Sequence, residues 1–161
     1  MNGLLYLVGI SGSGKSTAAR KLQEDTGAVV VSRDDIRMSL FGKAFGAGVD
    51  ENLVTQIEFS TLDEALSSGY SVISDNTHIN MKAIAEKIDV AENYGARPTI
   101  VFVDTALEQA LKNNRSRGAS GGRFVPESVI KSQESRLSFM RDDLRSLSDQ
   151  SPTRVALYVV C

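Results

Sequence analysis

The sequence predicts a single α/β domain over residues 1–161, with a five-stranded, mainly parallel sheet and helices on both of its faces. Short apolar runs alternate along the chain with segments of helical periodicity, which is typical of βαβ units. Most of these apolar runs are continuous, as expected for strands that are covered on both faces. A length of 161 residues also suits one domain.

The individual elements follow from the same pattern. Five segments rich in β-branched and apolar residues are predicted as strands: 4–8, 28–31, 70–73, 99–103 and 155–160. The segments predicted as helices are 17–26, 34–41, 51–68, 80–94, 107–114 and 126–147. The predicted helices 17–26, 51–68 and 80–94 each end before a glycine, which favours helix termination, and a proline opens the last helix. The glycine-containing stretches 42–48 and 118–122 are predicted as loops.

The composition excludes several classes of protein. Hydrophobic residues make up 42% of the chain and charged residues 24%, so a buried core is expected and overall disorder is not. No window approaches 18 uninterrupted apolar residues, so we expect no contact with a membrane. No secretory signal is recognised, and the single cysteine, Cys161, cannot form an intrachain disulfide. These features predict a cytoplasmic location.

Basic residues are concentrated in one segment of a chain whose net charge is −2. The segment 112–141 contains two acidic residues, Glu127 and Glu134. It contains seven basic residues: Lys112, Arg115, Arg117, Arg123, Lys131, Arg136 and Arg141. Charge alone favours a solvated helix surface, and the alternative is a local site for an anionic ligand on an acidic body.

The most specific motif is GISGSGKST at residues 9–17, which matches the phosphate-binding pattern G-x-x-x-x-G-K-[ST] between a predicted strand and a predicted helix. Small residues let backbone N–H groups point at phosphates, and the helix N-terminus adds to the field. Lys15 places a positive charge on the transferred phosphate, and Ser16 offers a hydroxyl to Mg²⁺. We therefore expect ATP, or another nucleoside triphosphate, to bind through Gly12, Ser13, Gly14, Lys15, Ser16 and Thr17. The alternative is a merely flexible Gly/Ser loop.

A second group of charged residues, SRDDIR at 32–37, follows the second predicted strand. Ligands of open α/β sheets bind at this edge. A carboxylate there can accept the proton of an attacking hydroxyl, while an arginine holds an anionic acceptor. The alternative is an N-capping Asp followed by a surface Arg, and the phosphate-binding motif favours the functional interpretation.

Four segments occur in the order GISGSGKST, SRDDIR, ISDNT and RSRG…RFVP. Together they resemble the kinase domain of 5′-hydroxyl polynucleotide kinases, the phage type included, within the P-loop phosphotransferase superfamily. The resemblance covers most of the chain. It implies a P-loop kinase fold with a basic lid at about residues 112–125. It also implies transfer of the γ-phosphate of ATP to the 5′-OH ends of DNA or RNA, which would be the partners of the protein.

The resemblance assigns catalytic and acceptor roles to residues of this chain. It makes Asp34 the general base on the 5′-OH and Arg37 the ligand of the acceptor phosphate next to the terminal nucleoside. It implies that Val125 packs on the terminal base. It also implies that Asn76 and Thr77, which follow the third predicted strand, line the acceptor site.

Asp75 and the lid arginines are the remaining candidates. Asp75 is placed with the acceptor-binding residues, and it can also orient Lys15 or a Mg²⁺-bound water; the alternative is an Asx-turn. By resemblance Arg117 is the catalytic lid arginine on the donor phosphates, with Arg123 second. Independently of the family, Arg115, Arg117 and Arg123 flank a glycine-rich hinge, which suits a lid that closes on phosphates.

Three functions remain open from the sequence. The favoured one is a polynucleotide kinase, either stand-alone or a fragment, without a phosphatase domain because no D-x-D-x-T motif occurs. The second is a small-molecule kinase for a nucleoside, sugar or antibiotic hydroxyl, and the third is a module that uses ATP only as a switch. Arg37 and Val125 distinguish the first two, since a neutral acceptor needs neither a phosphate ligand nor a stacking surface. A homo-oligomer is left open.

Overall fold

The structure is a computed structural model that describes residues 2–44, 46–77, 79–150 and 156–160. Cys161, which entered the argument on redox environment, lies outside the described residues. Among the described helices, none combines the length and the apolar composition that crossing a membrane requires.

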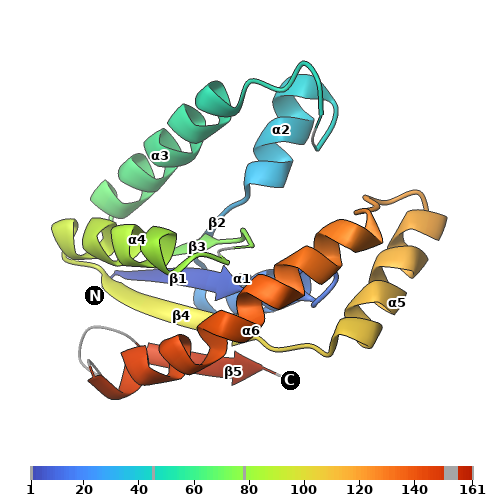
Figure 1. The fold of residues 1–161 in the computed structure, drawn as a ribbon. Helices are drawn as coiled ribbons and strands as arrows, with labels where there is room; N and C mark the ends of the chain where they lie inside the picture. Colours follow the sequence, from blue (N-terminus) through green and yellow to red (C-terminus); the bar gives the residue numbers. More distant parts are fainter. Residues whose placement is uncertain (1, 45, 78, 151–155, 161) are drawn as a thin grey trace.

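The strands form one parallel sheet (Figure 1). Its body consists of β2 (Val29–Val31), β3 (Val72–Ser74), β1 (Gly3–Val8) and β4 (Arg97–Val103), hydrogen-bonded in that order. The backbone of β5 (Ala156–Val160) pairs in parallel with β4 at the edge. The predicted α/β fold with a parallel sheet is confirmed.

Six helices connect the strands: α1 (Lys15–Thr26), α2 (Arg33–Phe41), α3 (Glu51–Ser67), α4 (Met81–Asn93), α5 (Leu107–Ala119) and α6 (Glu127–Gln150). The predicted end of the fifth helix at residue 114 is wrong, because α5 continues to Ala119. The side chain of Asn114, a residue that often ends helices, is instead bonded to the backbone of Val125. The helix therefore continues through residues 115–119 of the basic segment. The loop that connects it to α6 is residues 120–126, in place of the predicted 118–122, and the first part of the predicted lid at 112–125 is helical.

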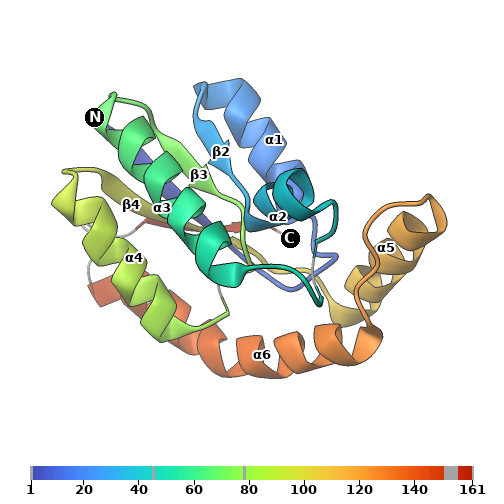
Figure 2. The ribbon, with the colours of Figure 1, turned by 90° about the horizontal axis from the view of Figure 1, so that it is seen from above.

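Helices cover both faces of the sheet, as predicted. On β1, Leu4 and Tyr6 pack in a cluster with α3, and Val8 packs in a cluster with α4, α5 and α6. Leu7 points to the opposite face, where it packs in a cluster with Ala19 of α1. This alternation is the two-residue period of a strand. Figure 2 shows α3 and α4 in front of the strands, with α5 and the loop 120–126 at the far end of α6.

This arrangement positions the charged segments. α1 and α2 begin where β1 and β2 end, so both helix N-termini lie at the carboxyl edge of the sheet. The loop 120–126, hereafter the lid loop, lies beyond the same edge (Figure 1). The phosphate-binding motif, the SRDDIR segment and the lid loop are thereby brought together from three parts of the chain.

Candidate active site

The phosphate-binding loop, residues 9–14, has a backbone shape that requires glycine. Gly12 has a φ of 83°, and a Cβ at this position would collide with the carbonyl oxygen of Ala110 in α5. Gly14, with a φ of 97°, is the N-cap of α1. Because the cap has no side chain, none of its atoms competes with an anion for the N–H groups at the helix start.

Three polar side chains from distant elements hold this loop. Thr105, after β4, donates to the carbonyl oxygen of Ser13 at 2.9 Å. Asn113, on α5, donates to the carbonyl oxygen of Gly12 at 2.9 Å. Gln133, on α6, accepts from an N–H of the loop at 2.8 Å. These side chains fix the loop in shape before any ligand binds, and no motif in the sequence indicates them.

Lys15, Ser16 and Asp75 form the base of the loop. The Lys15 ammonium donates to the carbonyl oxygen of Ile10 at 2.7 Å. Burial lowers the pKa of Lys15 to about 8, against the opposing effect of the nearby Asp75 carboxylate. Asp75 accepts a hydrogen bond from the Ser16 hydroxyl, and burial raises the pKa of Asp75. Of the roles weighed for Asp75, these contacts favour the orientation of Lys15 and of a metal-bound water.

The residues present fit a Mg²⁺ ion that is shared with a nucleotide. The Ser16 hydroxyl and the Asp75 carboxylate are adjacent oxygen groups, and Mg²⁺ prefers oxygen ligands while keeping several waters and substrate phosphates. Within the described part of the chain, no three His, Cys, Asp or Glu residues gather as a metal cluster. A site of this kind is completed by the phosphates. The buried Ser13 hydroxyl, which has no hydrogen-bond partner in the described structure, also suits a phosphate ligand.

Asp34 lies in the first turn of α2 on the opposite side of the site. Ser32 is the N-cap of this helix, and its side chain accepts from the backbone N–H of Asp35 at 3.3 Å. The capping role considered for Asp34 is therefore filled by another residue. The Asp34 carboxylate accepts from Arg37 at 2.9 Å and forms a second ion pair with Arg123 of the lid loop. It thus lies between the acceptor side and the lid.

Arg37 is fully engaged by carboxylates. Besides Asp34, it contacts Glu51, the first residue of α3, through Nε at 2.8 Å and Nη2 at 2.9 Å. Arg33 donates to the same Glu51 carboxylate at 2.8 Å. The hydrogen bond from Arg37 is the main reason why the pKa of Glu51 falls to about 2. Nothing in the sequence marks Glu51 as a site residue, because carboxylates are common at helix starts, where they interact favourably with the helix dipole.

A buried carboxylate behind this pair connects α2 and α3 to the loop after β3. Glu58 accepts from Arg33 at 2.7 Å and from the Asn76 amide at 2.8 Å, and Lys87 of α4 lies 3.6 Å away. The Asn76 amide oxygen also accepts from the backbone N–H of Arg33 at 3.1 Å. The structure therefore uses both ends of the Asn76 amide internally. The carbonyl oxygen of Thr77 accepts from the P-loop at 3.3 Å.

The lid loop is fixed at one end by a buried amide. Asn114 donates to the carbonyl oxygen of Val125 at 2.8 Å and accepts from its N–H at 2.9 Å. Arg117 donates to the carbonyl oxygen of Arg123 at 2.6 Å and also contacts Asn114. Arg117 and Arg123 both lower the pKa of Lys15, so both guanidinium groups lie near the P-loop. Arg115, in contrast, is paired with Glu127 at 2.6 Å.

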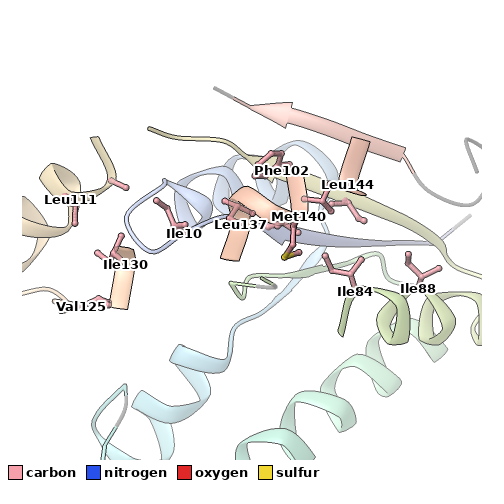
Figure 3. Packing of buried hydrophobic residues seen from close by; sticks show 13 residues of the cluster. Ile10, Ile84, Ile88, Phe102, Leu111, Val125, Ile130, Leu137, Met140 and Leu144 are labelled. Carbon is pink, nitrogen blue, oxygen red and sulfur yellow. The ribbon is translucent and has the colours of Figure 1, made fainter. Parts of the chain in front are cut away.

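The surface expected from Val125 is not open. Val125 is 4% exposed and belongs to the core cluster, near Ile130 and Leu111 (Figure 3). The adjacent Phe124 is 48% exposed instead. Because the two bonds from Asn114 fix the backbone of Val125, its side chain is directed into the core. Phe124 is therefore the exposed apolar side chain next to Val125 in this loop.

The chain matches a known protein family over most of its length. Residues 4–140 match the AAA domain family. The chain belongs to this family. It is a P-loop domain of the kinase type, and its similarity to polynucleotide kinases, described next, identifies it as a phosphotransferase domain.

Two proteins with similar sequences have names that refer to a polynucleotide kinase or to RNA repair. The chain is 30% identical over 129 residues to a protein of Autographa californica nuclear polyhedrosis virus that is named as a bifunctional polynucleotide kinase/RNA ligase. That match covers 71% of this chain and 18% of the viral protein. A chain in the structure of the Pnkp1/Rnl/Hen1 RNA repair complex is 28% identical, with a TM-score of 0.80, over 88% of this chain and 46% of that one. The AAA domain chain thus spans less than half the length of both proteins.

The same fold also occurs in a small-molecule kinase. A gluconokinase from Sinorhizobium meliloti 1021 is 19% identical, with a TM-score of 0.61, over 99% of this AAA domain and 83% of the gluconokinase chain. At that identity the likeness concerns the fold alone. The predicted resemblance to polynucleotide kinases is confirmed, whereas the class of acceptor is left to be argued from the site.

Proposed function

We propose that the chain is an ATP-dependent polynucleotide 5′-hydroxyl kinase, which transfers the γ-phosphate of ATP to the 5′-OH end of DNA or RNA. The observation that carries this proposal is the pair Asp34 and Arg37, 2.9 Å apart on one helix at the edge that also holds the P-loop. A carboxylate can take the proton of a hydroxyl. An arginine beside it can bind the phosphate that follows the terminal nucleoside.

On the donor side, the chain binds and orients the triphosphate. The P-loop backbone holds the β- and γ-phosphates. The Lys15 ammonium lies at the base of the loop, where it donates to the carbonyl oxygen of Ile10 at 2.7 Å. Ser16 and Asp75 would hold Mg²⁺, which when bound neutralises the charge that develops on the phosphates. Thr105 and Asn113 keep the loop in place, so little reorganisation accompanies binding.

On the acceptor side, Asp34 accepts the proton while the acceptor oxygen bonds to the γ-phosphorus. The bond from that phosphorus to the β–γ bridging oxygen breaks, and ADP leaves with the electron pair. Arg123 must first release Asp34, because a carboxylate shared by two arginines is a weaker base. The donor phosphates are a competing anion for Arg123. Donor binding and release of the base are thereby coupled through one lid side chain.

The alternative is a small-molecule kinase, since a gluconokinase shares the fold. Two observations favour the polynucleotide. The relatives at 28% and 30% identity are connected by name with RNA repair and polynucleotide kinase activity. The acceptor side also carries two arginines, Arg33 and Arg37, within hydrogen-bond distance of a single carboxylate, as suits an anionic acceptor more than a neutral one.

The experiment that tests the proposal uses γ-labelled ATP, Mg²⁺ and a 5′-OH oligonucleotide, as DNA and as RNA. A 5′-phosphorylated copy of each strand is the matched control. Label on the 5′-OH strands alone is the expected result. No label on either strand, with ATP still bound, would favour the small-molecule kinase and a screen of hydroxyl metabolites.

A further inference from the structure

The carboxylate of Glu51 lies against Arg37, where the proposed function places the phosphate of the acceptor. Two parallel hydrogen bonds, from Nε and Nη2 of Arg37, reach the two oxygens of Glu51 at 2.8 and 2.9 Å. This fork geometry is the one with which arginine binds phosphate oxygens. A phosphate that takes both nitrogens must displace the Glu51 carboxylate.

A phosphate can displace the Glu51 carboxylate from Arg37 at a low cost in free energy. Its side chain is 53% exposed, so it can turn toward water without a packing loss. It also accepts from Arg33 at 2.8 Å, and Arg33 is anchored independently by the buried Glu58 at 2.7 Å. When the carboxylate leaves Arg37, it can therefore keep Arg33 as a charged partner. Because the side chain is half exposed, water can hydrate the oxygens that lose Arg37.

We propose that Glu51 is a resident carboxylate that occupies the acceptor-phosphate site of Arg37 and is exchanged for the phosphate of the incoming strand. This inference rests on the proposed function for the identity of the acceptor. Arg37 keeps its contact with Asp34 through a third nitrogen, Nη1, so the exchange leaves the proposed base in place. Glu51 competes with the phosphate, so the apparent affinity for a phosphate-bearing acceptor equals the intrinsic affinity multiplied by the fraction of Arg37 that is free.

The competition predicts that removing the charge of Glu51 strengthens phosphate binding, whereas a purely supporting role predicts the opposite. The probe is adenosine 3′-monophosphate, titrated by calorimetry with saturating ADP and Mg²⁺ so that the P-loop is occupied. Glu51→Gln should bind the probe about 10-fold more tightly than the unaltered chain. Adenosine without the phosphate should bind both proteins equally.

Two further variants locate the effect. Glu86→Gln removes an exposed carboxylate that is paired only loosely with Lys82, at 4.0 Å on α4, and should leave probe affinity unchanged. Arg37→Ala in the Glu51→Gln background should abolish the gain; a gain that survives it would place the phosphate elsewhere and overturn the proposal. If Glu51→Gln does not fold, judged by its thermal unfolding, Glu51→Asp keeps the charge with a shorter reach and should give a smaller gain.

The outcomes separate this inference from the proposed function. Unchanged or weaker binding by Glu51→Gln, with transfer to 5′-OH strands intact, would overturn the competition and make Glu51 a support for Arg37. A gain in probe affinity without any transfer to polynucleotides would keep the exchange and reject the acceptor. In steady-state assays the gain should appear as a lower KM for 5′-OH oligonucleotides at unchanged kcat, a split that a merely structural residue does not give.

Discussion

The donor and acceptor sides of the site are assembled in different ways. On the donor side, the P-loop is one continuous segment, and its shape depends on glycines such as Gly12. On the acceptor side, Arg37 of α2, Glu51 of α3 and Arg123 of the lid loop are side chains brought together by the fold. The donor side is a preformed backbone cradle, whereas the acceptor side is a set of side-chain charges that neutralise one another.

The largest effect is expected where the preformed cradle loses its charge. Lys15→Ala should reduce transfer to every acceptor by about 10³-fold or more, because a positioned cation on the transferred phosphate is lost. The unfolding temperature should not fall, since burial already disfavours the charged form of Lys15, as its lowered pKa shows. Turnover within tenfold of the unaltered chain would contradict the P-loop assignment. Rates with labelled ATP and a thermal melt measure both effects.

Asp34→Asn tests the acceptor side at the proposed base. The substitution should lower kcat by about 10² to 10⁴, the range for a lost general base, with little change in the dissociation constant of ATP. Asp35→Asn is the matched control, because Asp35 is the adjacent carboxylate of the same helix and faces a cavity of 240 Å³ between β2, α2 and α3. Equal losses in both variants would place the proton acceptor elsewhere.

Arg37→Ala should distinguish acceptors rather than abolish transfer. Oligonucleotides with a phosphate beside the 5′-nucleoside should show a KM about 10- to 100-fold higher, as expected when a charge-assisted fork is removed. A plain nucleoside, which has no phosphate for Arg37 to bind, should be affected far less. The comparison requires initial rates for both acceptors at saturating ATP. The same loss for both would remove Arg37 from the acceptor-phosphate site.

The two lid arginines differ in what holds them, and their variants should differ accordingly. Arg117 braces the lid loop through the carbonyl oxygen of Arg123 and through Asn114, so Arg117→Ala should lower both kcat and the unfolding temperature. In the proposed mechanism Arg123 leaves Asp34 for the donor phosphates. Arg123→Ala therefore removes a cation from those phosphates and should lower kcat alone. A stability loss confined to Arg123→Ala would reverse these assignments. Thermal melts and rates with labelled ATP measure the two variants side by side.

The continuous P-loop could be predicted from the sequence, whereas the acceptor side, assembled from separate elements, could be predicted only in part. The order of strands and helices and the P-loop depend on periodicity and on a local motif, and both were predictable. Glu51 and Glu58 were not, because their partners Arg37 and Arg33 come from another helix and an acidic residue carries no sign of its partner. The side chains that hold the P-loop, those of Thr105, Asn113 and Gln133, lie between 92 and 122 residues along the chain from the loop residues they contact. No sequence spacing indicates these contacts.

The lid shows why a resemblance alone cannot place side chains. Val125 matched a position that packs on a base, but the two bonds from Asn114 turn it into the core and leave Phe124 exposed. Asn114 also allowed α5 to continue to Ala119. One buried amide therefore accounts for both departures from the expected lid. Its effect could not be read from a residue type that usually favours helix ends.

The smallest effect concerns the pH dependence of donor binding, and its sign follows from the pKa of Lys15. Burial lowers this pKa to about 8, while bound phosphates, being negative, raise it. Above pH 8 the chain must therefore take up a proton to bind ATP, and the dissociation constant should rise by up to about tenfold per pH unit. Below pH 8 the ammonium is already charged, so Lys15 should contribute no slope. The phosphates lose their last proton near pH 6 and add no slope in the alkaline range.

A matched variant sharpens this prediction. The Asp75 carboxylate raises the pKa of Lys15, so Asp75→Asn should move the onset of weaker binding to a pH below that of the unaltered chain. The measurement is a titration of ATP without Mg²⁺ between pH 6.5 and 9.5, because Asp75 is also a proposed metal contact. An onset that stays fixed in Asp75→Asn would assign the slope to another group. A donor affinity that is flat across the whole range would show that Lys15 keeps its charge in the P-loop despite its burial, and that the cradle is more polar than its contacts imply.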